Sequence, residues 1–345
     1  MDDILILLSF FVVSLPLPTP ENNRSKFRAN SLLNDSVILF PNQLIGPKSI
    51  AVASDGRLFT GTYGGHVYEI KDDSSLDIYT TIPNGRPIGM RCDTKGNLYF
   101  TEANSGLYVS DLKTRNVQKL IGFEDTKRLS KSGQISKFFD DLVLVESSEG
   151  MSVYLTDVSR KFSLDFWSYI YLEPDSTGRV LRYDLQTGKL SVVLDDLWFP
   201  NGIEVNDRKD ALLINELTKR RVLKHYISGP KRGTTEVLIE NLPGEPDNIR
   251  FVFIFLIILL TYSLFFWTIS RSLAKEETYW IGLALKRDSE NSAIIDRLSG
   301  RPVCKKLLLR LSYILGMNLL IIFMFLKFLM NLRINFTQIG ENISI

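Results

Sequence analysis

Two stretches of sequence decide the fold, namely SIAVASDGRLFTGTYGGHVYEI at residues 49–70 and GMRCDTKGNLYFTEANSGLYVSD at residues 89–111. Each contains an apolar strand, a turn that ends in Gly, a strand with Phe-Thr near its end, and a further strand. The two turn glycines, Gly56 and Gly96, are 40 residues apart. A period near 40 residues with several short strands per repeat is typical of a β-propeller, in which each repeat forms one four-stranded blade.

Longer repeats follow in the next part of the chain. They open near Leu142, at FPNGIEV (Phe199–Val205) and at PGEPDNIR (Pro243–Arg250), and the second strand of the last one is expected only at TYWIGLAL (Thr278–Leu285). About five blade starts can be recognised, and no sixth one follows. We therefore predict an all-β fold of the six-bladed propeller type over residues 43–315, with its sixth blade missing.

Composition and charge exclude several classes of function. The 345 residues include 41 Lys+Arg and 39 Asp+Glu, and eleven of these basic and six of these acidic residues lie after residue 250. The first 250 residues are therefore mildly acidic, which argues against binding to nucleic acid. Two Cys exclude a disulfide-dense scaffold and a cysteine-based zinc site. Two His exclude a three-histidine metal site.

The N-terminus carries an uncharged hydrophobic run from Ile4 to Leu17. As a helix this run would be about 21 Å long, shorter than the roughly 30 Å hydrocarbon core of a bilayer. We interpret residues 1–20 as a signal peptide, with a short signal anchor as the alternative. Both predict the secretory pathway, and the glycosylation sequons at Asn23 and Asn34 agree with that route.

A second hydrophobic run, residues 251–270, is uncharged and long enough to span a membrane as a helix. It interrupts the fifth repeat, whose strands must pair with each other, so we predict that it lies outside the propeller and is not a working membrane span. Its wealth of Phe, Ile and Leu is typical of translated T-rich noncoding DNA. We interpret it, and the similar hydrophobic tail at 316–345, as a retained intron or mispredicted gene model, with a genuine helical hairpin insertion as the alternative.

Several motifs of the propeller part together point to a known family. They are VYLTDVSRKF (153–162), GRVLRYDLQTGKLSVVLDDLWFPNGIEV (178–205), SGPKRGTTEV (228–237) and NLPGEPDNIR (241–250). In this order they resemble the strictosidine synthase-like family. The resemblance implies a six-bladed propeller with a central metal ion on its axis. Plant members catalyse a Pictet–Spengler condensation, whereas animal members are membrane-anchored and resemble arylesterases and lactonases.

The resemblance also implies a set of metal ligands at the entries of the innermost strands. Calcium binds six to eight oxygens from carboxylates, amides and water, and Asp and Asn side chains supply this chemistry. The matching residues here are Asp140 (or its neighbour Asp141), Asn201, Asp247 and Asn248. Without the family pattern, Asp and Asn before strands are ordinary turn formers. With the family pattern, the cofactor that these oxygen ligands predict is calcium.

Lys48 departs from the family pattern. The family motif Gly-Pro-Glu-x-Ile is here Gly46-Pro47-Lys48-Ser49-Ile50, so an ammonium stands where a carboxylate ligand is expected. An ammonium is not a metal ligand, and it repels Ca²⁺. One hypothesis is that Lys48 replaces the ion with a fixed positive charge that pairs with Asp140 and Asp247.

No catalytic residue can be assigned from the sequence. The last blade, which carries the glutamate base of strictosidine synthases, is missing, and we interpret His66 and His225 as structural. We interpret Cys92 as a small buried residue in a strand. The sequence gives no support for a disulfide between Cys92 and Cys304. The aromatic segment at 161–174 and the pair Trp198-Phe199 are either blade packing or the lining of a ligand-binding mouth.

Three functions follow from these observations. The first is a calcium-dependent arylesterase- or lactonase-like hydrolase of the secretory pathway that takes a small apolar or ester ligand. The alternative is a non-catalytic, membrane-tethered binding propeller, which Lys48 and the missing blade favour. A third is a membrane protein with two spans. The sequence does not indicate whether the chain is an enzyme or how it oligomerises.

Overall fold

The structure is a computed structural model that describes residues 39–71, 75–173, 176–251, 272–274 and 277–286. Several sequence predictions therefore lie outside the described residues. They concern the N-terminal segment 1–20, the sequons at Asn23 and Asn34, the hydrophobic run after Phe251, and the missing sixth blade and tail after residue 286.

The described chain forms five antiparallel sheets that follow one another in sequence order. The first four sheets have four strands each, and in each of them neighbouring strands are consecutive in the chain. Blade one contains β1 (Ile50–Val52), β2 (Leu58–Gly61), β3 (His66–Ile70) and β4 (Leu76–Thr81). Blade two contains β5 (Pro87–Cys92), β6 (Asn97–Glu102), β7 (Gly106–Asp111) and β8 (Val117–Gly122).

Blade three contains β9 (Phe138–Ser147), β10 (Gly150–Ser159), β11 (Gly178–Asp184) and β12 (Leu190–Leu197). Blade four contains β13 (Pro200–Val205), β14 (Ala211–Glu216), β15 (Arg221–Tyr226) and β16 (Thr235–Ile239). The described part of blade five contains β17 (Gly244–Phe251), β18 (Ser272–Ala274) and β19 (Glu277–Lys286). The strand order within these blades confirms the repeated unit predicted from the sequence.

The repeated turns of blades one and two explain why these sequences form hairpins. Gly56 and Gly96 have φ angles of 89° and 87°, a left-handed conformation that glycine adopts without steric cost. The strands on either side of these turns carry side chains that pack between blades one and two. Phe59 and Phe100 are fully buried there in one hydrophobic cluster with Tyr79.

The innermost strands, β1, β5, β9, β13 and β17, lie next to one another in that order around the axis. Two of their glycines let neighbouring strands approach closely. A Cβ on Gly89 would lie 2.5 Å from the carbonyl oxygen of Asp140, and a Cβ on Gly202 would lie 2.4 Å from that of Asp247. Side chains entering this axis from different blades are therefore brought into contact.

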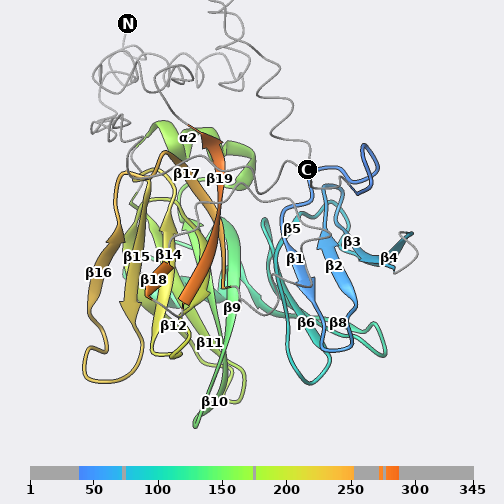
Figure 1. The fold of residues 1–345 in the computed structure, drawn as a ribbon, viewed down its shortest axis with the longest axis horizontal. Coiled ribbons are helices and arrows are strands. Elements are labelled where there is room, and N and C mark those ends of the chain that lie inside the picture. The colour runs from blue at the N-terminus through green and yellow to red at the C-terminus, as the bar shows by residue number, and fades with distance from the viewer. Residues whose placement is uncertain (1–38, 72–74, 174–175, 252–271, 275–276, 287–345) are drawn as a thin grey trace, which may run out of the picture.

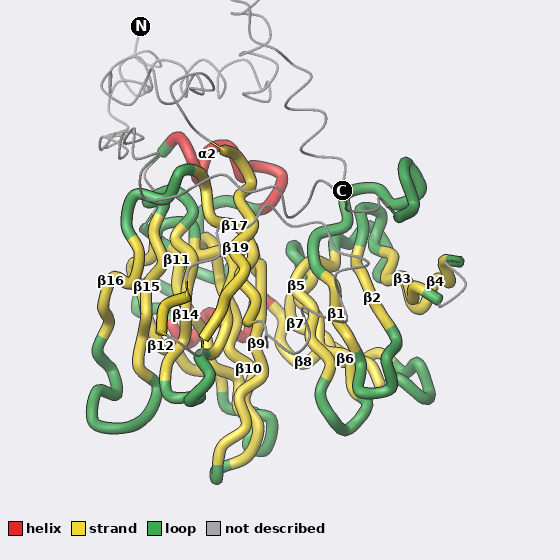
Figure 2. The backbone as a smooth tube through the Cα atoms, viewed as in Figure 1, coloured by secondary structure: helices red, strands yellow, loops and turns green. Residues whose placement is uncertain are grey.

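Helices η2 (Leu164–Phe166) and α2 (Trp167–Leu172) cover one end of the propeller (Figure 2). The other short helix, η1 (Phe123–Leu129), contacts β8 and β12 instead. Helix α2 was not predicted, because six residues give too little helical periodicity to be recognised. Among the described helices, none has the length and apolar character needed to cross a bilayer.

The strands that flank the second hydrophobic run pair in one blade, as predicted. Strand β17 runs antiparallel to β19, and Phe251 lies opposite Tyr279. Their rings are 5.3 Å apart and close blade five against Leu213 of blade four. Strands β17 and β19 therefore belong to one blade although they lie on either side of this hydrophobic run in the sequence.

Candidate functional site

Lys48 joins four blades at the axis. It lies just before β1, and its Nζ is 2.5 Å from both carboxylate oxygens of Asp140 in β9. The same nitrogen is 3.3 Å from Oδ1 of Asn201 in β13 and 3.4 Å from Oδ1 of Asp247 in β17. The ammonium thus donates hydrogen bonds to acceptors from blades three and four, and it forms an ion pair with a carboxylate of blade five. The pairing of Lys48 with both aspartates, expected from the sequence, is confirmed.

Asn248 fixes the backbone of the same segment. Its Nδ2 donates to the carbonyl oxygen of Lys48 at 3.1 Å, so blade five holds blade one through main chain as well as side chain. The side-chain oxygen of Asn248 is buried and has no hydrogen-bond partner among the described residues. All four residues predicted as metal ligands therefore lie at one place, around the Lys48 segment.

Burial and charge act in opposite directions on this cluster. Burial lowers the pKa of Lys48, but the negative charges of Asp140 and Asp247 outweigh it, so the pKa is raised and the ammonium keeps its proton. Burial raises the pKa of Asp140 to about 6, against the attraction of Lys48. The fixed cation is thus what allows a carboxylate to stay charged in this position.

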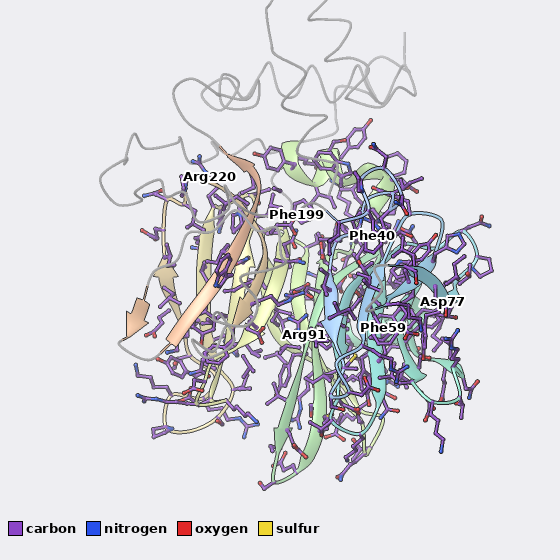
Figure 3. The ribbon with its side chains drawn as sticks, turned by 45° about the vertical axis from the view of Figure 1, so that its right-hand side comes forward. Phe40, Phe59, Asp77, Arg91, Phe199 and Arg220 are labelled. Carbon is purple, nitrogen blue, oxygen red and sulfur yellow. The ribbon has the colours of Figure 1, made fainter. Side chains whose placement is uncertain are left out.

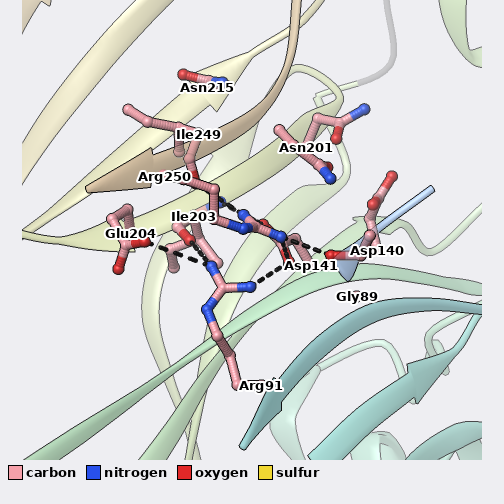
Figure 4. A network of polar contacts seen from close by, with 12 residues as sticks. Gly89, Arg91, Asp140, Asp141, Asn201, Ile203, Glu204, Asn215, Ile249 and Arg250 are labelled. Atoms are coloured by element: carbon pink, nitrogen blue, oxygen red, sulfur yellow. Dashed lines mark hydrogen bonds and ion pairs between the residues drawn. The ribbon is translucent and has the colours of Figure 1, made fainter. Parts of the chain in front are cut away.

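A second charged layer lies deeper along the axis (Figure 4). Asp141, in β9, accepts two hydrogen bonds from Arg250 of β17, at 2.7 and 3.2 Å, and lies 3.5 Å from Arg91 of β5. Arg91 also lies 3.5 Å from Glu204 of β13. Burial alone would raise the pKa of Asp141, but the two guanidinium groups outweigh it and lower the pKa. This layer holds the inner strands together below the Lys48 cluster.

The sequence analysis missed this second layer. Its signal is a charged residue four positions after the proline at a strand entry, as in Pro87–Arg91, Pro200–Glu204 and Pro246–Arg250. A charge inside an otherwise apolar strand is costly to bury unless it is paired. Since the partners come from other blades, only the assembled propeller shows how these charges are paired.

Arg86 adds another cation close to the first layer. It precedes β5, is 7% exposed, and its guanidinium lies 4.0 Å from the ring centre of Tyr63. Burial lowers its pKa, while the nearby charges of Asp140 and Asp247 act in the opposite direction. The cluster therefore contains two cations, Lys48 and Arg86, and two carboxylates.

An aromatic cap covers the same end of the axis. In helix α2, Tyr171 donates a hydrogen bond of 2.5 Å to Glu245 at the start of β17. Phe199, which precedes β13, packs in one buried cluster with Phe138 and residues of the cap and lies near this end of the molecule, whereas Arg91 lies deeper (Figure 3). Trp167 at the start of the helix is 46% exposed. The described part of the segment 161–174 therefore packs on the blades through Phe162, Tyr169 and Ile170, while Phe166 and Trp167 are exposed.

The histidines and the described cysteine are structural. His66 bonds to Thr81 within blade one, and His225 bonds to Thr235 within blade four. They lie in different blades and form no pair. Cys92 is half-buried and forms no disulfide with another described residue, and burial raises the pKa of its thiol to about 12. Cys304 lies outside the described residues, so the pairing of the two cysteines stays untested.

The residues present do not fit a calcium ion as they stand. The ammonium of Lys48 lies among the oxygens that would have to coordinate the ion, at hydrogen-bonding distances from them. Calcium needs six to eight oxygens at 2.3–2.6 Å, and a fixed positive charge at their centre repels it. Within the described ranges, no three His, Cys, Asp or Glu side chains group to form a metal site.

The blades and the axial cluster define a β-propeller whose polar site is built from strand entries. Comparison with known proteins gives the same class. Residues 141–230 match the family described as strictosidine synthase, and residues 26–70 match the family described as strictosidine synthase-like, N-terminal. Two parts of the chain thus match strictosidine synthase-like family models, and the resemblance inferred from its motifs is confirmed.

Relatives of this chain include adipocyte plasma membrane-associated proteins. The bovine protein is 32% identical over 293 residues and the human protein 30% over 294 residues, each covering 82% of this chain. The chain spans less than two thirds of these relatives, 64% of each. The solved structure of a gluconolactonase from Xanthomonas campestris has a TM-score of 0.50 at 15% identity, with 69% of this chain and 77% of that one covered. At this identity the likeness concerns the fold alone.

Proposed function

We propose that this chain is a non-catalytic binding propeller of the secretory pathway, tethered to a membrane, whose axial mouth takes a small apolar ligand without a metal ion. The observation that carries the proposal is the position of Lys48 Nζ, 2.5 Å from Asp140 and within reach of Asn201 and Asp247. A metal-dependent hydrolase needs an ion there to polarise the carbonyl of its substrate. An ammonium already paired with protein oxygens does not supply this chemistry.

The surroundings of the mouth suit an apolar ligand. Phe138, Phe199 and Ile170 form a buried cluster next to it, and Phe166 and Trp167 expose about half of their surface at its border. Aromatic side chains of this kind bury a large apolar area in contact with a ligand. The tether and the location rest on the relatives, whose names describe them as associated with the plasma membrane.

The experiment measures hydrolysis and binding on the same full-length protein. Turnover of phenyl acetate is measured in calcium and in EDTA, with heat-denatured protein as the background. We expect no turnover above background in either buffer. Quenching of tryptophan fluorescence by phenyl acetate, with Trp167→Phe as the matched control, should saturate equally in both buffers. Turnover that requires calcium and disappears in EDTA would overturn the proposal in favour of the hydrolase.

A further inference from the structure

We infer that Lys48 is a built-in cation, and that the axial cluster is a latent divalent-cation site which a carboxylate at position 48 would open. This inference deepens the proposed function. It rests on the proposed function in one respect, namely that the native chain does not require a metal ion. The donor set is already in place. Asp140, Asn201 and Asp247 direct oxygens at one nitrogen, although they come from three different blades.

The backbone at position 48 would carry a new ligand to the same point. The hydrogen bond from Asn248 Nδ2 to the carbonyl of residue 48 does not involve the lysine side chain, so it remains after substitution. The buried side-chain oxygen of Asn248 is a further potential metal ligand, because it has no hydrogen-bond partner in the described part of the chain. A glutamate at 48 would thus join two carboxylates and two amide oxygens, and water would complete the shell that calcium prefers.

The charges favour the same conclusion. Native Lys48 and Arg86 oppose the carboxylates of Asp140 and Asp247, so the cluster is balanced without an ion. Replacement of Lys48 by glutamate would leave three carboxylates against Arg86 alone. One divalent cation restores the balance, and a buried uncompensated charge is strongly unfavourable without it. The variant should therefore depend on calcium, whereas the native protein should not.

The test compares the melting temperatures of full-length proteins in EGTA and in calcium, with calcium binding measured by calorimetry. The native protein should melt at the same temperature in both and bind no calcium. Lys48→Glu should melt lower in EGTA, bind about one calcium ion, and recover by about 5 °C or more when calcium exceeds its Kd by ~100-fold. The control Lys131→Glu makes the same charge change on an exposed lysine outside the cluster and should show no calcium effect.

A second variant covers the case in which Lys48→Glu does not fold in EGTA. Lys48→Met removes the charge but adds no ligand, so it should melt lower than the native protein, with a smaller response to calcium. Folding of Lys48→Glu only in calcium supports the inference. The inference is overturned if calcium shifts the native protein, or if Lys48→Glu neither binds calcium nor responds to it while Lys48→Met folds. Turnover of native protein in EDTA would instead overturn the proposed function and leave this inference standing.

Discussion

The buried ion pair of blade three gives a prediction whose size and pH dependence can both be worked out. Arg179 and Asp157 are fully buried, with Nε of the arginine 2.7 Å from Oδ2 of the aspartate. Ser136 donates a hydrogen bond of 2.6 Å to the same oxygen and accepts one of 3.1 Å from Arg179. Arg179→Met keeps much of the side-chain volume but removes the only guanidinium bonded to this carboxylate among the described residues.

Loss of one partner from a buried pair lowers the free energy of unfolding by about 3–5 kcal/mol, because the remaining charge stays uncompensated. Burial raises the pKa of Asp157 to about 6 from 3.8, with Arg179 opposing the shift, so the variant raises it further. A carboxylate with a raised pKa in the folded state favours folding below its unfolded pKa. That contribution is lost as the pH rises through the folded pKa. The cost of Arg179→Met should therefore be small near pH 5 and full near pH 8.

Urea denaturation followed by tryptophan fluorescence measures this cost at about pH 5 and about pH 8. The double variant Asp157→Asn with Arg179→Met carries neither charge of this pair and is the matched control. It should recover part of the stability at the higher pH and lose the pH dependence. A cost for Arg179→Met that is below about 1 kcal/mol, or equal at both pH values, would refute the reasoning.

Two further predictions concern the axis and the blade cores. Gly202→Ala should lower the free energy of unfolding by more than about 2 kcal/mol, because its Cβ would lie 2.4 Å from the carbonyl oxygen of Asp247. Gly122→Ala, whose Cβ meets nothing closer than 3.7 Å, should be nearly neutral in the same denaturation assay, and equal effects would contradict the close strand approach. Cys92 in a Cys304→Ser background should react with a thiol reagent at about pH 8 only after unfolding, since burial raises its pKa to about 12. Rapid reaction of the native protein would show that its strand opens.

The parts of the fold that local sequence encodes were predictable. Turn glycines such as Gly56 and Gly96 determine hairpins without reference to the rest of the chain, and their spacing gave the blades. The Lys48 pairing was also predictable, because the strand entries of a propeller must meet at its axis. Helix α2 was not, since its six residues are held by packing of Tyr169 and Ile170 rather than by propensity.

The charged layer was unpredictable for a related reason. Arg91, Asp141 and Arg250 each violate the apolar pattern of a buried strand, and each is explained only by a partner on another blade. Pairings between residues 109 positions apart, as for Asp141 and Arg250, have no local signature. Single charges in innermost strands are therefore informative only when they are considered across all repeats at once.

The pairing of Phe251 with Tyr279 has a consequence for engineering. Partner residues on antiparallel strands have Cα atoms roughly 5 Å apart, so the blade itself keeps the two flanking chain ends next to each other. A turn of about two to five residues is enough to join them. A reporter domain can consequently be inserted between Phe251 and β19 while the pairing of β17 with β19 is retained. In the same way, residues 252–276 can be exchanged for an Asn-Gly turn.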